Sequence, residues 1–175
     1  CVYFDAQMDD HAIVLQNARS AAASGATILT DVTITEFIKQ GVQLTGLHYT
    51  DKEGGEHQLM ADCVVNVTGA WANDVLQKTD PKEGPIVQAS KGVHILTKPL
   101  PYTEAFILEA PQDGRIFFIV PKEDHSLIGT TDTLYNGNPN NVSVEAEEIE
   151  YLMTAAQHYF PTLVGADIID SYAGL

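Results

Sequence analysis

Residues 63–72 read Cys63-Val64-Val65-Asn66-Val67-Thr68-Gly69-Ala70-Trp71-Ala72, and this stretch decides the fold that we expect. A short run of β-branched and apolar residues, such as residues 63–67, is typical of a buried strand, often a parallel one. Gly69 lets the backbone turn and lets another group approach closely. A strand, a turn of small residues and a helix N-terminus suit an anionic or dinucleotide ligand, although many α/β proteins have this unit without a cofactor.

The composition narrows the classes of partner. The 175 residues include 9 Lys and Arg against 24 Asp and Glu, a formal charge of −15. This balance argues against nucleic acid and against an anionic membrane surface as partners of the chain itself. Only Cys1 and Cys63 are present, which favours a reducing compartment without disulfides. We see no signal peptide and no apolar run long enough to span a bilayer, and we expect a piece of a longer cytoplasmic protein.

The residues before this stretch predict a helix and short strands. A helix is expected from about residue 11 to residue 24, capped by Asp9 or Asp10, with small residues that suggest packing on a sheet. Gly41, Gly46 and the polar segment 51–55 separate three strands of a β-meander. The expected strands in this part of the chain cover residues 1–4, 26–29, 32–38, 42–50 and 57–61.

The residues after this stretch predict a second helix and a sheet. A helix is expected from about residue 70 to residue 77, and the polar segment 78–85 is the best candidate for a domain boundary. An antiparallel sheet should follow, with a helix over residues 144–160 packed on one face, capped by Ser143 and ended by Pro161. The expected strands cover residues 87–89, 92–97, 105–109, 115–120, 126–129 and 167–172.

The most suggestive polar pattern is Lys91-Gly92-x-His94, where a histidine near a glycine at a strand start could act as a general base. Spacing alone favours a plainer interpretation, in which Lys91 lies at the surface and His94 is simply hydrogen-bonded. The segment Gly129-Thr130-Thr131-Asp132 could orient a ligand or close a turn, and the turn is commoner. Arg115 could hold a phosphate, although an ordinary ion pair is commoner. No histidine pair has metal-binding spacing, so we assign no metal.

Several segments, in order, resemble a known family. They are Tyr3-Phe4-Asp5 with Met8-Asp9-Asp10, Val64 to Trp71, Ser90-Lys91-Gly92-Val93-His94-Ile95, Gly114-Arg115 with the strand to Pro121, Ile128 to Asp132, and Tyr172-Ala173-Gly174. Taken together, this set resembles the FAD-dependent glycerol-3-phosphate dehydrogenases, respiratory flavoenzymes, over essentially all 175 residues.

The resemblance implies an α+β fold and a central fragment of the family's chain. Residues 1–80 would be part of an FAD-binding α/β domain interrupted by the β-meander. Residues 81–175 would be an antiparallel-sheet substrate-binding domain flanked by helices, with a return strand toward the FAD domain. The family's Gly-x-Gly-x-x-Gly phosphate loop does not occur in these 175 residues.

The resemblance also implies a chemistry. The family oxidises sn-glycerol 3-phosphate to dihydroxyacetone phosphate, with electrons passing through FAD to a membrane quinone, and it works at the inner face of the plasma membrane. His94 would be the base at the C2 hydroxyl, and Lys91 would assist with charge. The cofactor-binding residues implied by the match are Val32 at the adenosine half, and Thr68, Gly69 and Trp71 at the strand end.

Four positions depart from the family's pattern, and two rival functions stay open. Ala12 and Gln88 stand where the family often has arginine, Ala70 where it has proline, and Lys122 where it often has tryptophan. The missing cations at 12 and 88 could weaken ion pairs or anion binding. One rival is another glycine-oxidase-like FAD oxidoreductase acting on an amine or a hydroxy acid. The other is a non-catalytic module that keeps the fold without flavin.

Overall fold

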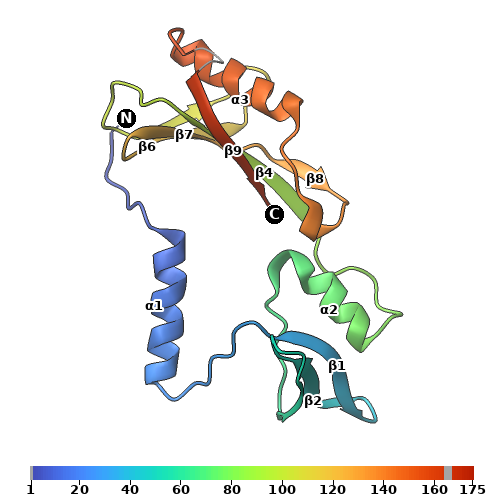
Figure 1. Ribbon diagram of the computed structural model, residues 1–175. Coiled ribbons are helices and arrows are strands. Elements are labelled where there is room, and N and C mark those ends of the chain that lie inside the picture. The colour runs from blue at the N-terminus through green and yellow to red at the C-terminus, as the bar shows by residue number, and fades with distance from the viewer. Residues whose placement is uncertain (1, 164–166) are drawn as a thin grey trace. The chain divides into compact units, whose positions relative to one another are not determined.

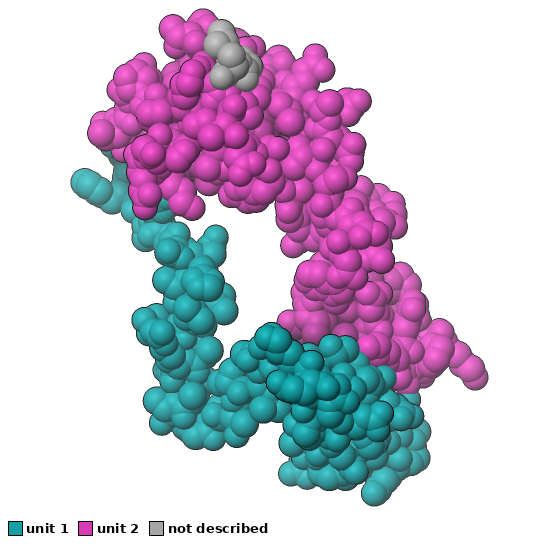
Figure 2. Space-filling model, viewed as in Figure 1, with its two compact units in different colours: residues 1–65 teal, residues 66–175 magenta. Residues whose placement is uncertain are grey.

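The computed structural model describes residues 2–163 and 167–175. These residues form two compact units, residues 1–65 and residues 66–175, which Figure 2 shows in different colours. The domain boundary predicted between residues 80 and 81 concerns a longer protein, and it stays a prediction.

The first unit contains one helix and a three-stranded meander (Figure 1). Helix α1 (Asp10–Ala23) begins where Asp9 accepts a hydrogen bond from the Ala12 N–H at 2.9 Å, as predicted for a capping aspartate. None of its residues is buried, so the packing expected from its small residues is not seen within the described chain. The strands β1 (Thr33–Gln40), β2 (Gln43–Thr50) and β3 (Glu56–Met60) pair antiparallel in chain order, which confirms the meander.

Three strand predictions in residues 1–67 are wrong. Residues 2–4 and 26–29 form no strand, and residue 1 lies outside the described residues. Residues 63–67, expected to be a buried strand, are also unpaired, and the side chains of Val65 and Val67 are 72% and 84% exposed. A strand needs a neighbouring strand for its backbone hydrogen bonds, and the described residues supply none here. β-Branched residues favour an extended chain but do not create that neighbour.

The predicted helix after residue 69 is confirmed in the second unit. A 3₁₀ turn, η1 (Gly69–Trp71), leads directly into α2 (Ala72–Thr79). The side chain of Asn73 ties this helix to the chain ahead of the sheet, because it donates to the Val87 carbonyl at 2.7 Å and accepts from the N–H groups of Ile86 and Val87. The link fixes the point at which the backbone enters the sheet.

The second unit is built on an antiparallel sheet, as predicted (Figure 1). The order of five strands is β5-β6-β7-β4-β8, and β9 pairs with β4 as well. The segment predicted at 92–97 lies in a longer strand, β4, which begins at Ala89, so only the last residue of the segment predicted at 87–89 is in a strand. Strand β8 was not predicted. The strands are β4 (Ala89–Thr97), β5 (Phe106–Glu109), β6 (Ile116–Lys122), β7 (His125–Gly129), β8 (Thr133–Tyr135) and β9 (Ile168–Gly174).

Strands β7 and β8 pair one after the other with β4. Gly129 lies opposite His94 and Thr133 lies opposite Lys91, so residues 130–132 face only residues 92–93. Three residues between β7 and β8 thus lie opposite two residues of β4, and this one extra residue makes the interruption a β-bulge. Thr131 stabilises it, since its hydroxyl accepts from the Val93 N–H at 2.9 Å. Bulges re-aim side chains, and this one turns residues 130–132 away from the regular ladder.

Helix α3 (Ala146–Tyr159) covers one face of this sheet (Figure 1). Leu152 on the helix and Val93 and Ile95 on β4 are 0% exposed, which confirms the predicted packing. The predicted cap is corrected. Glu145, not Ser143, is the N-cap, and the Ser143 hydroxyl instead donates to the Glu145 carboxylate at 2.8 Å. The turn η2 (Pro139–Asn141) lies between β8 and this helix.

Candidate functional site

Side chains of β4 alternate between the two faces of the sheet. Lys91, Val93 and Ile95 are buried on the α3 side, whereas Gly92 and His94 are on the opposite face and partly exposed. This alternation is the two-residue period of a strand. Among the described helices of the second unit, none covers the face that carries His94, so within this unit the face is open to a ligand.

His94 lies in the middle of a row of residues that crosses four strands. The register places Phe118 of β6 opposite Gly129 of β7, Gly129 opposite His94 of β4, and His94 opposite Tyr172 of β9. The rings of His94 and Tyr172 stack, with centroids 5.1 Å apart and planes at 12°. The imidazole is therefore held among its neighbours and is not a loose surface group.

Burial lowers the pKa of His94 below its ordinary value, because partial burial disfavours the charged imidazolium. A neutral imidazole can accept a proton, which is what a general base requires near neutral pH.

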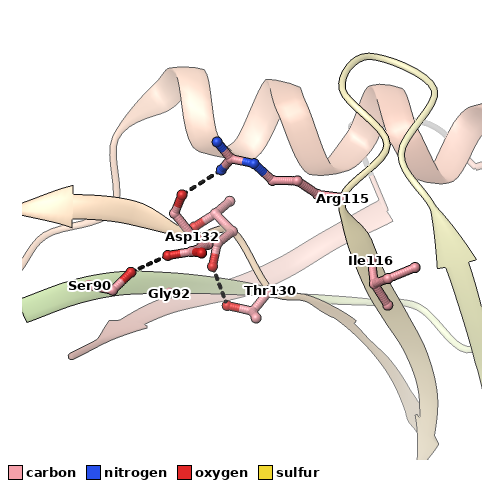
Figure 3. Close-up of a pocket in the computed structure, with 7 residues that line it drawn as sticks. Ser90, Gly92, Arg115, Ile116, Thr130 and Asp132 are labelled. Carbon is pink, nitrogen blue, oxygen red and sulfur yellow. Dashed lines mark hydrogen bonds between the residues drawn. The ribbon is translucent and has the colours of Figure 1, made fainter.

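An open hollow of about 470 Å³ (Figure 3) is lined in part by Gly92, which lies two residues before His94 on the same face of β4. The bulge residues form one side of it, and Arg115 and Ile116 approach from β6 and the turn before it. Its lining consists of Ser90, Gly92, Arg115, Ile116, Thr130, Thr131 and Asp132. Hydroxyl and carboxylate groups dominate its polar surface, so it suits a ligand with several hydroxyl groups.

Arg115 is tied to its surroundings. Its Nε lies 3.3 Å from the Asp113 carboxylate, and its guanidinium donates to the Asp132 carbonyl (Figure 3). The ordinary ion pair that we considered commoner is therefore present. Asp132 in turn accepts a hydrogen bond from the Ser90 hydroxyl. Thr130, Thr131 and Asp132 thus line the hollow, and they do so from a bulge and not from the turn that we considered commoner.

Lys91 is not brought together with His94. Its ammonium group lies on the α3 side, 2.8 Å from the Glu148 carboxylate, and donates to the Ser143 carbonyl at 3.1 Å. Burial raises the pKa of Glu148, but the hydrogen bond and charge of Lys91, with the Glu145 N–H, outweigh this effect and lower it overall. Lys91 is thus a buried structural cation, and the surface lysine favoured by spacing alone is a wrong interpretation.

The expected cofactor residues lie in both units. Thr68, Gly69 and Trp71 are exposed at the start of η1, where Gly69 has a φ of +55°. The Trp71 indole N–H donates to the Asn140 side chain at 3.0 Å, which fixes its ring. Val32 is half-buried just before β1 in the first unit. Their shared role at a cofactor stays a prediction.

The sequence analysis did not predict three residues that contact Lys91 or His94. Gly129 and Tyr172 contact His94, and Glu148 pairs with Lys91. Only the cross-strand register could have revealed Gly129 and Tyr172, and no local sequence pattern specifies that register. The acidic first turn of α3 was visible, but its pairing with a lysine 57 positions earlier was not.

Two further observations limit the site. Within residues 2–163 and 167–175, no group of three or more His, Cys, Asp or Glu side chains is arranged to hold a metal ion. In the same residues, the helices are all too short or too polar to cross a bilayer.

Comparison with solved structures supports the fold. The glycerol-3-phosphate dehydrogenase from Bacillus halodurans, solved as a complex with FAD, superposes with a TM-score of 0.87 at 32% identity, covering 96% of this chain and 35% of that one. The L-proline dehydrogenase from P. horikoshii shares the fold, with a TM-score of 0.64 at 16% identity over 93% of this chain and 42% of that one. The predicted α+β fold is confirmed.

Sequence comparisons agree. The aerobic glycerol-3-phosphate dehydrogenase of Staphylococcus haemolyticus is 28% identical over 99% of this chain and 32% of its own length. The D-erythritol 1-phosphate dehydrogenase of Brucella abortus is 34% identical over 99% of this chain and 35% of its own length. This chain therefore spans about a third of the length of the curated relatives it matches. The resemblance noted in the sequence is confirmed.

The family described as FAD dependent oxidoreductase matches the whole chain, residues 1–175. This chain belongs to that family of FAD-dependent oxidoreductases.

Proposed function

We propose that this chain is part of an FAD-dependent enzyme that oxidises glycerol 3-phosphate to dihydroxyacetone phosphate. One arrangement in the structure carries the proposal: a half-buried histidine, whose pKa is lowered by burial, shares a face of β4 with Gly92, which lines a hollow that also contains hydroxyl groups. The relatives named for this substrate support it. Because the chain covers only about a third of those relatives, the activity is a property of the full-length protein.

His94 is the proposed base. Oxidation of the C2 alcohol to a ketone removes a proton from the hydroxyl oxygen and a hydride from C2. His94 takes the proton, and its lowered pKa keeps the imidazole neutral and ready to do so. Lys91 pairs with Glu148 on the far side of the sheet, and we therefore omit it from the proton transfer.

The residues present fit an FAD. When bound, FAD supplies the acceptor for the hydride that leaves C2. Around the position where a Gly69 side chain would begin, no described atom outside Gly69, its two chain neighbours and the backbone of its own helix lies within 4 Å, so a cofactor can approach the backbone there. Thr68 precedes Gly69 and Trp71 follows it in the same turn, and we assign the three residues to the cofactor, with Val32 at its adenosine half.

We propose a quinone as the electron acceptor, with the full-length protein bound peripherally to the inner face of the plasma membrane. Relatives are named both dehydrogenase and oxidase, as in the alpha-glycerophosphate oxidase of Enterococcus casseliflavus. Purified full-length protein should therefore be assayed with a soluble quinone and with oxygen as separate acceptors. Flotation with anionic vesicles would test the membrane association.

A substrate panel tests the activity. Full-length protein reconstituted with FAD should reduce a dye acceptor with glycerol 3-phosphate far faster than with glycerol, glycine or L-proline. Erythritol 1-phosphate belongs in the panel because one relative is named for it. Preference for an amine would establish the rival flavin oxidase, and a colourless protein that binds no FAD would establish the non-catalytic module.

The pH dependence follows from His94. Because burial lowers the pKa of His94, the base stays neutral to lower pH than an ordinary histidine, and the acid limb of kcat/KM is expected below about pH 6.5. Activity is full above the pKa of His94 and falls as the pH drops through it. A His94→Gln variant should lose this limb along with most of its activity. An unchanged limb in that variant would assign the titration to another group.

The isolated chain of 175 residues is expected to bind FAD weakly. Its sequence has no Gly-x-Gly-x-x-Gly loop, whose backbone N–H groups normally hold the pyrophosphate. Titration of the purified chain with FAD, followed by flavin fluorescence, measures the affinity. Purification with stoichiometric flavin would contradict this expectation.

A further inference from the structure

Gly129 occupies a position where a side chain cannot be added without moving His94. A Cβ atom at residue 129 would lie 2.2 Å from His94 Cδ2 and 2.8 Å from both Cγ and Nε2. All three atoms belong to the imidazole ring, so the ring lies directly over the glycine. Gly129 is not among the glycines with a positive φ, so a left-handed backbone does not explain the need for glycine at this position.

Tyr172 contacts the same ring from the neighbouring strand on the other edge of β4. Its ring stacks on His94 with a centroid separation of 5.1 Å and an angle of 12°. Strand β7 thus provides space on one side of β4, and strand β9 provides an aromatic surface on the other. Stacked aromatic rings attract one another beyond the effect of the area they bury.

Packing rather than hydrogen bonding sets the orientation of this ring. Within the described part of the chain, neither ring nitrogen of His94 has a hydrogen-bond partner. Both nitrogens are left for a ligand, and the imidazole cannot rely on an acidic partner to fix its angle. A base must lie within hydrogen-bond reach of the proton that it removes, so the residues that pack on the ring control that reach.

We propose that Gly129 and Tyr172 are positioning residues for His94: the glycine leaves the space that the imidazole occupies, and the tyrosine ring stacks against it. This inference rests on the proposed function, because it matters for catalysis only if His94 is the base. It makes a glycine in the segment Gly129-Thr130-Thr131-Asp132 a determinant of turnover without any contact to substrate.

The first test is Gly129→Ala in the full-length protein loaded with FAD. The added methyl group must push the ring away, so kcat is expected to fall about 10- to 100-fold, as a base misplaced by about 1 Å would. KM should change by less than about threefold, because the substrate keeps its other contacts. The acid limb of kcat/KM should move to higher pH as the displaced ring becomes more exposed. Normal turnover with an unchanged limb would overturn the proposal.

Gly174→Ala is the matched control for structure. Gly174 is a strand glycine on β9 opposite Gly92, and a Cβ there would meet no atom within 4 Å. NMR of the histidine ring signals should show His94 displaced by Gly129→Ala and unaffected by Gly174→Ala. This readout does not depend on turnover. If His94→Ala stays active, the proposed function fails, while the ring signals still decide whether Gly129 positions His94.

A double variant separates the ring from the backbone. Gly129→Ala should lower the melting temperature when His94 is present, and it should lower it by less than half as much in a His94→Ala background, where the small side chain leaves room. An equal loss in both backgrounds would mean that the backbone, not the imidazole, requires the glycine, and it would overturn the role of Gly129.

Tyr172 is tested by a conservative pair of variants. Tyr172→Phe keeps the aromatic ring and should keep kcat within about threefold, whereas Tyr172→Leu loses the stacking and should lower kcat about tenfold or more. Equal losses in the two variants would show that the hydroxyl group, not the ring, carries the effect, and would overturn the stacking role.

Discussion

Replacing His94 with alanine in the full-length protein is expected to lower kcat for glycerol 3-phosphate by about 10²–10⁴-fold, the usual contribution of a positioned general base. The effect should appear in kcat and kcat/KM together, because the group acts mainly in the transition state. The partly buried, neutral imidazole on the uncovered face of the sheet is the basis of this expectation. Steady-state kinetics with a dye acceptor, at equal flavin content, measure it.

His158→Ala is the control for this variant. His158 is an exposed histidine in the last turn of α3, on the opposite side of the same sheet. Surface substitutions usually change the free energy of unfolding by less than about 0.5 kcal/mol, so the His158→Ala protein should stay folded. Its turnover should then remain within about twofold of wild type. If His94 only ordered its strand, its loss would cost about 1 kcal/mol of stability with near-normal turnover in the folded protein. That outcome would remove His94 from the reaction.

The sequence predicted the elements whose signals are local. The helix after Asp9 and the helix that ends before Pro161 follow from caps and breakers. The meander follows from polar turns between short runs of apolar residues. The capping of α3 was wrong by two residues. Serine is a preferred cap, but the helix begins after Glu145, which forms a reciprocal capping box with Glu148.

The sequence could not predict features that depend on distant partners. Residues 63–67 have strand propensity, but an exposed Val67 shows that propensity alone cannot provide a paired neighbour. The site was predicted in part. Lys91 and His94 are near in sequence, yet strand alternation puts them on opposite faces. The row formed by Gly129, His94 and Tyr172 depends on register across three strands, which no local pattern specifies.

Removal of one partner from the buried ion pair between Lys91 and Glu148 is expected to be among the most destabilising single changes in the second unit. The two side chains are only 9% and 10% exposed, and their charged atoms are 2.8 Å apart. The remaining capacity of the carboxylate is used by the Thr133 hydroxyl at 3.2 Å and the Glu145 N–H at 3.0 Å. Removal of the lysine therefore leaves a buried charge without its counter-charge.

Lys91→Met should lower the free energy of unfolding by about 3–5 kcal/mol, the usual cost of breaking a buried pair from one side. Lys98→Met is the matched control: Lys98 is 65% exposed, pairs with Asp167 at 3.1 Å, and should cost about 0–1 kcal/mol. The double variant Lys91→Met with Glu148→Leu should recover part of the loss, because it removes the unpaired charge. Urea unfolding of the full-length protein, followed by a probe in this unit, measures all three. Recovery of stability in the double variant would identify the unpaired Glu148 charge as the source of the loss. An equal loss of unfolding free energy in Lys91→Met and Lys98→Met would instead show that burial of the Lys91–Glu148 pair does not determine the cost of breaking it.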